Sequence, residues 1–332
     1  MEEFDILKKK VGEHYHFFHL DGKKVCNKKI LEYVSSLYFP PAYENIRINS
    51  DRKAKRYGVG TDSKNRKQYL YTKSWGDVAL NNKFKQILKF SKHISKIKKE
   101  LYRNLDLDFN QNLKLILVSL GLLLIIECNF RVGSQMGVEK YKSFGVSTLE
   151  KSHFKYKNQQ YKITFIGKKG VLNENIVENP KINALIKKIL NKNQNSKIFN
   201  FSSREGKNPI QDIKVDANDM NNYLKTWGNF SSKNFRTWMA NYIFLEILKK
   251  ILKKTEYDKS KITHRKKIIK EAIEKTAEKL HHTPAISKKS YIFSELWKPF
   301  VEERPEHFEN LKNSSTFLIE FLKIKSNYRD VK

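Results

Sequence analysis

Hydrophobic and polar positions follow two different periods along the chain, and the change falls near residue 78. Before it, short apolar–polar alternations are separated by polar turns, and HYHFFHLDGKKV has the pattern of a strand, an Asp-Gly turn and a second strand. Beyond it, apolar residues recur at helical spacing, first in FKQILKFSKHISKIKKELYRNL. We therefore predict a small β-rich N-terminal domain, residues 1–78, and a larger, mostly helical domain, residues 79–332.

The second domain is predicted to be helical apart from one β-like island. Its core helix is expected over Leu113–Glu127, where nearly every position is apolar. Other helical patterns cover PKINALIKKILNK, Ile210–Trp227, Phe235–Leu252, Ile268–Leu280, Pro284–Glu302 and Phe317–Lys325. The island SHFKYKNQQYKITFIGKKGVLNENIV alternates, with turns at 157–160 and 167–170, and predicts a three-stranded meander. The predicted fold class is α+β.

A membrane location is not favoured by the sequence. The longest apolar run, LKLILVSLGLLLIIECNF, has an uninterrupted part shorter than the roughly 20 residues that span a bilayer. The opening MEEFDILKKK is acidic and then basic, so we expect no secretion signal. Cys26 and Cys128 lie far apart and form no CxxC pair, which favours a reducing, intracellular compartment without structural zinc or disulfides.

The charge of the chain points to a polyanionic partner. The 332 residues carry a formal net charge of +31, while 39% are hydrophobic and 12% aromatic, enough for a folded core. Such an excess speeds encounter with polyanions, and each neutralised phosphate releases counterions. Nucleic acid is therefore the expected partner.

Several kinds of phosphoryl chemistry lack their usual motifs. The chain has no GxxxxGK[ST] loop for a triphosphate, no Asp/Glu cluster typical of a two-metal nuclease and no HExxH or Cys/His zinc set. We expect no metal and no cofactor. If the protein acts on phosphodiesters, Arg, Lys and His must stabilise the charge, and the nucleophile is a side chain or a water.

Five short stretches contain residues suited to such chemistry. They are Gln68, Tyr69 and Tyr71 in KNRKQYLYTKSW, Arg131 in FRVGSQMGVEKYKSFGVSTL, Lys168 and Lys169 in FIGKKGV, Lys233 and Arg236 in SSKNFRTWMANYIFLE, and His282 and Tyr291 in LHHTPAISKKSYI. Taken singly, each has an ordinary structural or phosphate-binding interpretation. Their joint occurrence, in this order, is what favours a reaction centre.

The chemistry of a phosphodiester explains why these residue types belong together. Attack on phosphorus builds negative charge on the non-bridging oxygens, which two arginines and a histidine can bind with directed donors. A lysine at a hairpin tip can protonate the leaving 5′-oxygen as a general acid. A tyrosine hydroxyl can attack and hold the phosphate covalently, so that resealing needs no ATP.

These motifs resemble those of the poxvirus-like type IB DNA topoisomerases. In that family an Arg-x-Gly follows a core helix and precedes Gly-x-x-Thr-Leu, as in RVGSQMGVEKYKSFGVSTL. A Phe-x-Gly-Lys hairpin corresponds to FIGK, which assigns the family's lysine to Lys168 rather than Lys169. Lys-x-x-Arg-Thr corresponds to Lys233 and Arg236. His-Thr-Pro, with a tyrosine nine residues after the histidine, corresponds to His282 and Tyr291. The resemblance covers nearly the whole chain.

The resemblance implies an ATP- and metal-independent topoisomerase. Tyr291 would attack one strand and hold its 3′-phosphate, while Arg131, Arg236 and His282 would stabilise the transition state. Lys168 would protonate the 5′-oxygen. The DNA-binding residues would be Lys233, Gln68, Tyr69 and Tyr71. The implied partner is duplex DNA, with a preference for a pyrimidine-rich, CCCTT-like site, and the protein would act as a monomer. In a virus it would work in the host cytoplasm or the virion.

Two positions depart from the family pattern. A tyrosine usually lies six residues after the first arginine, where this chain has Gly137, and the nearest tyrosine is Tyr141. The glycine that commonly precedes His-Thr-Pro is His281 here, so the chain offers two adjacent histidines. The spacing to the tyrosine favours His282.

Two other functions fit parts of the pattern. Tyrosine recombinases share the constellation, but they usually show His-x-x-Arg where this chain has Lys233-x-x-Arg236, and they more often begin with a helical domain. A non-catalytic DNA-packaging protein would account for the charge. In that case Tyr291→Phe would leave every activity unchanged.

Overall fold

The structure is a computed structural model that describes residues 3–205, 208–302, 308 and 313–327. The chain divides into two compact units, Met1–Phe84 and Lys85–Lys332. The division lies a little beyond residue 78, within a helix rather than at its start. We refer to them as the N-terminal unit and the C-terminal unit.

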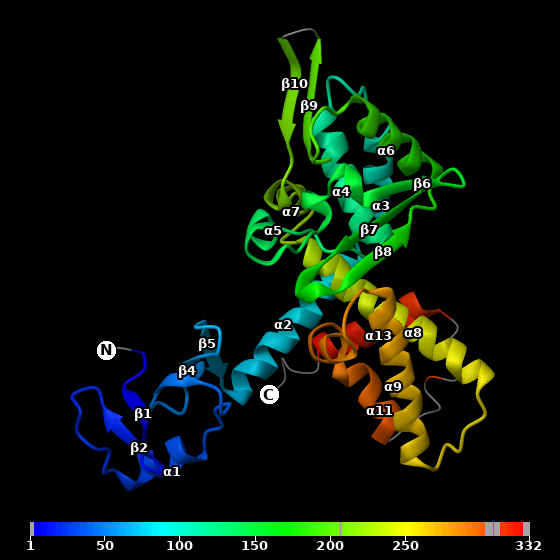
Figure 1. Ribbon diagram of the computed structural model, residues 1–332. Helices are drawn as coiled ribbons and strands as arrows, with labels where there is room; N and C mark the ends of the chain where they lie inside the picture. The colour runs from blue at the N-terminus through cyan, green and yellow to red at the C-terminus, as the bar shows by residue number, and fades with distance from the viewer. Residues whose placement is uncertain (1–2, 206–207, 303–307, 309–312, 328–332) are drawn as a thin grey trace. The chain divides into compact units, whose positions relative to one another are not determined.

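The N-terminal unit is built on a five-stranded antiparallel sheet in the order β2-β1-β3-β4-β5 (Figure 1). The strands are β1 (Ile6–Val11), β2 (His14–His19), β3 (Glu44–Ile48), β4 (Arg56–Thr61) and β5 (Lys67–Tyr71). Helix α1 (Lys28–Ser36) contributes Val34 to the core that Ile6 and Ile48 form on one face of the sheet. β5 is an edge strand, so the turn between β4 and β5 lies at the margin of the sheet.

Two local predictions for this unit are wrong. Helix α1 was not expected; it forms because KKILEYVSS has a helical apolar stripe and because the Asn27 side chain caps the Ile30 amide at 3.2 Å. β2 pairs along its whole length with β1, whereas across the Asp-Gly turn a single bridge joins Phe18 to Lys24. The six-residue β1 offers β2 a longer partner than the short segment after Gly22 does.

Helices dominate the remainder of the chain. They are α2 (Lys73–Ser91), α3 (Ile94–Asn104), α4 (Leu113–Glu127), α5 (Gln135–Tyr141), α6 (Pro180–Lys192), α7 (Ala217–Lys225), α8 (Ser232–Lys254), α9 (Ile262–Lys279), α10 (Pro284–Ile286), α11 (Ser294–Glu302) and α13 (Ser314–Asn327). The predicted core helix is confirmed as α4, which is buried on all sides and packs against α3, α7 and α8.

The predicted meander is confirmed as an antiparallel sheet of three strands (Figure 1). The strands are β6 (Phe154–Lys157), β7 (Gln160–Ile166) and β8 (Leu172–Ile176), joined by tight turns at the expected places. The second turn contains a short 3₁₀ segment, Lys168–Gly170, with Lys169 and Gly170 at positive φ. Lys168 therefore lies at the hairpin tip.

Two helix predictions in the C-terminal unit are wrong in part. Residues 210–214 do not begin a helix; they belong to β10 (Asn208–Lys214), which pairs with β9 (Asn200–Glu205) in a ribbon that projects from the unit (Figure 1). Helix α7 starts only after Asp216, whose carboxylate caps the Asn218 and Asp219 amides.

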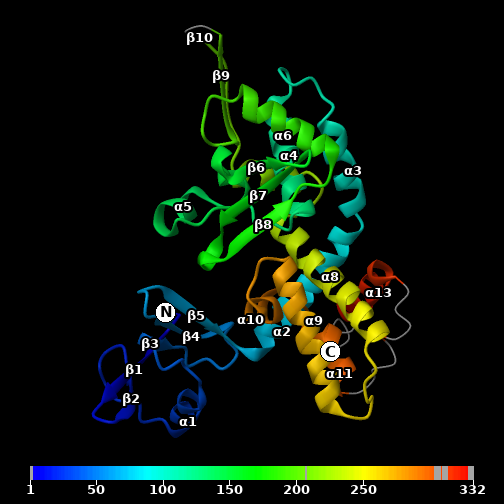
Figure 2. The same ribbon diagram turned by 45° about the vertical axis from the view of Figure 1, so that its right-hand side comes forward.

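The expected helix over Pro284–Glu302 is broken. Helix α10 continues into a single π-helical turn, Ser287–Tyr291, and the chain is extended at Ile292 before α11 begins. Figure 2 shows α10 beside α9. No helix in the described part of the chain is long and apolar enough to cross a bilayer.

Candidate active site

The segment after α4 is fixed by two glycines that touch. Gly133 has φ +82°, and a Cβ built on it would lie 2.8 Å from the Cα of Gly145. The Val146 amide donates to the carbonyl of Arg131 at 2.8 Å, and Thr148 Oγ1 accepts from the Gly145 amide at 2.9 Å. The two glycines of the Arg-x-Gly…Gly-x-x-Thr pattern thus allow two backbone segments to cross closely, and this crossing holds Arg131 at the end of the core helix.

Arg236 lies buried in the first turns of α8 and joins the ends of two other helices. Its Nη1 donates to the Asn129 carbonyl, and its Nη2 donates to the Leu280 carbonyl at 2.8 Å. Each acceptor is at a helix C-terminus, where carbonyls lack helical partners and the helix dipole is negative. Burial, together with the nearby charge of Arg131, lowers the Arg236 pKa to about 10.

His282 is buried between Arg236 and a serine. Its Nε2 contacts Arg236 Nη2, and its Nδ1 lies 3.2 Å from Ser287 Oγ. A guanidinium can only donate, so Nε2 accepts and the proton belongs on Nδ1, which donates to the serine hydroxyl. Burial, followed by the charges of Arg236 and Arg131, lowers the His282 pKa to about 2, so the imidazole is neutral.

Tyr291 is held at the end of the π-helical turn by a buried asparagine of α8. Asn241 Nδ2 donates to the Tyr291 carbonyl at 3.0 Å, and Asn241 Oδ1 accepts from the Phe293 amide at 2.9 Å. The Ile292 amide closes the turn by donating to the Ser287 carbonyl. The backbone on both sides of the tyrosine is therefore fixed to α8, which also carries Arg236.

The Tyr291 ring lies against the cationic and imidazole groups of the site. It stacks on His282 with centroids 4.4 Å apart, and Arg236 Cζ is 5.7 Å from its centroid. Burial opposes ionisation of the hydroxyl, but the charges and hydrogen bonds of Arg236 and Arg131 outweigh it and lower the Tyr291 pKa below its ordinary value. The surroundings of Tyr291 therefore favour the ionised form of its hydroxyl more than water does.

The structure brings together four of the five predicted catalytic residues. Arg131, Arg236, His282 and Tyr291 interact with one another, whereas Lys168 lies exposed on the β7–β8 turn. The Phe144 amide donates to the Ile166 carbonyl at 2.9 Å, which ties this hairpin to the loop that follows Arg131. Lys233 is exposed at the start of α8, one turn before the buried Arg236.

The three predicted DNA-binding residues of the N-terminal unit lie on both faces of the edge strand β5. Tyr69 and Tyr71 share one face and are 41% and 47% exposed. Gln68 lies on the opposite face, together with Leu70, which packs on the core of the unit. The two tyrosines and the glutamine therefore do not share one face of β5.

The two positions that depart from the family pattern both lie close to helix ends. His281 follows the last helical residues of α9 with φ +52°, the left-handed position that favours glycine; its ring lies near Phe130 and hydrogen-bonds the Cys128 carbonyl. Gly137 lies in α5, where the Ser134 side chain caps its amide. Tyr141 lies one turn further along α5 and is 68% exposed.

Comparison with known proteins identifies the family of the chain. The family described as eukaryotic DNA topoisomerase I, catalytic core, matches residues 72–312. DNA topoisomerase 1B of Acanthamoeba polyphaga mimivirus is 32% identical over 324 residues, which cover 96% of this chain and 94% of the relative. The chain belongs to the type IB DNA topoisomerases. DNA topoisomerase 1B of vaccinia virus (strain Copenhagen) and DNA topoisomerase I of monkeypox virus are each 27% identical over 273 residues, 80% of this chain and 78% of each relative.

The topoisomerase relaxes supercoiled DNA and binds duplex DNA, as its family implies.

The site contains residues that the sequence did not single out. Asn241 and Ser287 are fully buried and contact the tyrosine backbone and the histidine ring. Asn241 follows Arg236 at a spacing of five residues and Ser287 follows His282 at the same spacing, but in the sequence neither differs from an ordinary polar residue.

Proposed function

We propose that this topoisomerase cleaves one DNA strand with Tyr291 and holds the 3′-phosphate as a phosphotyrosine, without ATP or metal. The observation that carries the proposal is the stacked Tyr291–His282 pair against the Arg236 guanidinium, with the Tyr291 pKa lowered by Arg236 and Arg131.

In the proposed first step the Tyr291 oxygen attacks the scissile phosphorus. Its proton passes to water as the hydroxyl ionises. The bond between phosphorus and the 5′-oxygen breaks as the bond to the tyrosine forms, and Lys168 donates a proton to that oxygen. The phosphodiester energy is retained in the phosphotyrosine, so the free 5′-hydroxyl can attack it after the strand has rotated and restore the DNA.

The negative charge that develops on the non-bridging oxygens of the phosphate would be bound by three side chains. Arg131 and Arg236 supply guanidinium donors, and His282 supplies its Nε2 once that atom carries a proton. In the DNA-free protein Nε2 accepts, so binding of the phosphate requires the proton to move from Nδ1 to Nε2. Ser287 Oγ can follow this change, because a hydroxyl both accepts and donates.

The DNA contacts are proposed from both units. Gln68, Tyr69, Tyr71 and Lys233 would bind duplex DNA, and a preference for a pyrimidine-rich, CCCTT-like site would follow the family. The enzyme would act as a monomer. The viral relatives support a place of action in a host cell or a virion.

The decisive experiment is relaxation of negatively and positively supercoiled plasmid in EDTA without ATP, comparing the wild type with Tyr291→Phe. We expect the wild type to relax both and the variant to relax neither, with a loss on the order of 10⁴-fold or more. Tyr242→Phe is the control, since Tyr242 lies on the same helix as Arg236 and outside the cluster. Relaxation by Tyr291→Phe at the wild-type rate would refute Tyr291 as the nucleophile, and dependence on added metal would refute the metal-free mechanism.

A further inference from the structure

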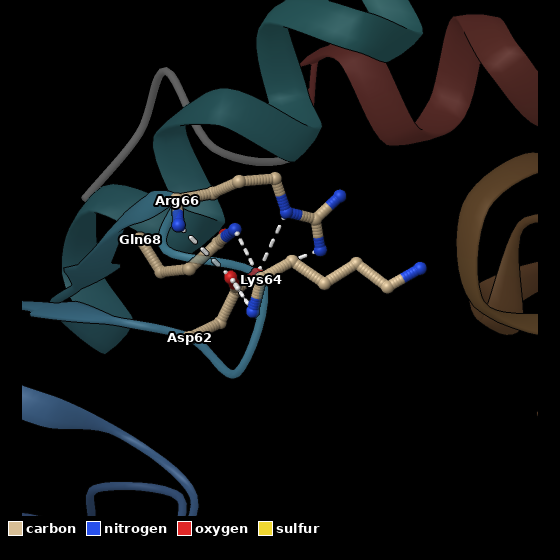
Figure 3. Close-up of polar contacts among 4 residues, drawn as sticks. All are labelled: Asp62, Lys64, Arg66 and Gln68. Carbon is tan, nitrogen blue, oxygen red and sulfur yellow. Dashed lines mark hydrogen bonds and ion pairs between the residues drawn. The ribbon is translucent and has the colours of Figure 1, made fainter. Parts of the chain in front are cut away.

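The turn between β4 and β5 is organised around one carboxylate. Asp62 Oδ1 accepts from the amides of Lys64 and Arg66, each at 3.0 Å. Asp62 Oδ2 accepts from Arg66 Nε at 2.9 Å, from Arg66 Nη2 at 2.6 Å and from Gln68 Nε2 at 2.9 Å (Figure 3). Asn65, at φ +55°, completes the turn by donating its amide to the Asp62 carbonyl at 2.8 Å.

The two carboxylate oxygens have separate roles. Oδ1 accepts from main-chain amides and therefore holds the turn, whereas Oδ2 accepts from side chains and therefore holds Arg66 and Gln68. The Asp62 side chain is 12% exposed and that of Arg66 is 59% exposed, so the carboxylate lies beneath the group that it orients. Hydrogen bonds from Arg66, the largest cause, keep the Asp62 pKa well below its usual range, and the group is ionised at neutral pH.

A carboxylate in this position lowers the affinity of the protein for DNA, because it repels phosphates and partly neutralises an exposed arginine. In return it fixes the orientation of the Gln68 amide, because a carboxylate accepts only from the nitrogen side of that group. Gln68 Oε1 is then directed away from Asp62, and in the described part of the chain no residue donates to it. Each base edge presents its own pattern of hydrogen-bond donors and acceptors. An amide that is fixed offers its donor and its acceptor in set positions and therefore discriminates between bases, whereas an amide that rotates does not.

We propose that Asp62 is a positioning residue that orients Gln68 and Arg66 for contact with base edges and thereby sets where this topoisomerase cleaves. The inference rests on the proposed function, which places Gln68 on DNA. It adds a residue that contacts no DNA itself, and it predicts an effect on site choice rather than on the chemical step.

The substitution Asp62→Asn separates this role from simple electrostatics. The amide oxygen can keep the main-chain bonds of Oδ1, while the amide nitrogen faces the donors of Arg66 and Gln68 and cannot bind them. Loss of a negative charge alone would strengthen binding to any DNA. Loss of positioning would instead reduce discrimination among sites. Asp21→Asn is the matched control, since Asp21 also caps a turn of the same sheet, through the Lys23 amide at 3.0 Å.

The test maps covalent cleavage at nucleotide resolution on an end-labelled DNA fragment of mixed sequence and measures affinity for the same fragment. We expect Asp62→Asn to lower the ratio of cleavage at the strongest site to that at the average site by roughly tenfold. Its affinity should equal or exceed that of the wild type, and its single-turnover rate at saturating protein on the strongest site should be unchanged. Asp21→Asn should leave the map unchanged.

Gln68→Ala and the double variant Asp62→Asn/Gln68→Ala separate the possible failures. If Gln68→Ala flattens the map and the double variant flattens it no further, Asp62 acts through Gln68. If Gln68→Ala flattens the map while Asp62→Asn behaves like Asp21→Asn, the positioning role is refuted and the DNA contact of Gln68 stands. A wild-type map for Gln68→Ala would overturn both the contact and the inference drawn from it.

Discussion

The site around Tyr291 and the turn around Asp62 both consist of charged side chains joined by hydrogen bonds, yet they are built in opposite ways. The first collects Arg131, Arg236, His282 and Tyr291 from distant parts of the chain and largely buries them. The second takes its residues from one turn and leaves most of them exposed.

The contrast separates chemistry from recognition. In the buried site, desolvation and mutual charge lower the pKa of His282 to about 2 and that of Arg236 to about 10, because Coulomb interactions are strong where water is excluded. In the exposed turn, salt and water screen the charges, so the geometry of the hydrogen bonds rather than the charge determines how the turn acts. Stabilisation of a transition state requires the buried cluster of charges, whereas recognition of a base edge needs only the fixed hydrogen bonds of the exposed turn.

The largest expected effect tests whether burial is required for a role in the chemistry. Lys168→Ala should slow single-turnover cleavage by roughly 10²–10⁴-fold, the range of general acid catalysis, although Lys168 is exposed, as Lys64 and Arg66 of the turn are. A substrate with sulfur in place of the 5′-oxygen should restore the rate, since a thiolate leaves without a proton. Lys169→Ala, a change of the adjacent hairpin lysine, should have little effect. If Lys169→Ala instead slows cleavage more than Lys168→Ala does, and if the sulfur-containing substrate restores its rate, the general acid is Lys169.

Arginines in the two regions should respond very differently to loss of their charge. Arg236→Gln should reduce the cleavage rate by roughly 10²–10³-fold. It should also raise the Tyr291 pKa, so that the increase of rate with pH moves to higher pH. Arg66→Gln should change the rate at saturating protein by about threefold or less, because the role proposed for the exposed Arg66 is in binding, which saturating protein compensates. Equal losses in a stopped-flow or rapid-quench assay would remove the distinction between the regions.

Acid should destabilise the buried site before it affects the turn. Burial, first among the causes, lowers the pKa of His281 and His282 below the value near 6.5 that they have when unfolded. The unfolded chain therefore binds protons first, and stability should fall as the pH drops below about 6.5, by at most about 1.4 kcal/mol per pH unit for each histidine. Asp62, whose pKa is lowered, contributes stability that is lost only below the unfolded value near 4.

Denaturant unfolding between about pH 7 and pH 5 measures this difference. His282→Gln should flatten the pH dependence, while Asp62→Asn should shift stability equally across that range. A slope in His282→Gln as steep as that of the wild type would mean that the histidine is not held neutral.

The smallest expected effect is that of residues with positive φ on stability, and this effect should be the same in the buried and the exposed region. His281 and Asn65 both have positive φ, one in each region. His281→Gly should be more stable than His281→Ala by about 1 kcal/mol, and the same difference should separate Asn65→Gly from Asn65→Ala. Thermal unfolding of the two pairs measures it. A difference in only one region would show that packing rather than φ determines the preference.

Much of the local structure could be predicted from the sequence because it depends on neighbouring residues. The all-round apolar pattern of Leu113–Glu127 permits only a buried helix, and the alternation around Gln160–Ile166 with Gly167 after it permits a hairpin. Residues 210–214 were assigned wrongly because a short apolar–polar segment fits either period, and pairing with β9 decided it.

Residue types and their spacing established the family, the α+β architecture, and the candidate arginines, histidine, lysine and tyrosine of the site. The tertiary structure decided the rest. It placed Asn241 on the backbone beside Tyr291, set the Nε2 of His282 against the Arg236 donor so that the proton lies on Nδ1, and joined the ends of α4 and α9 through Arg236. Contacts between residues far apart in the chain leave no periodic pattern in the sequence, and pKa values depend on burial that only packing creates.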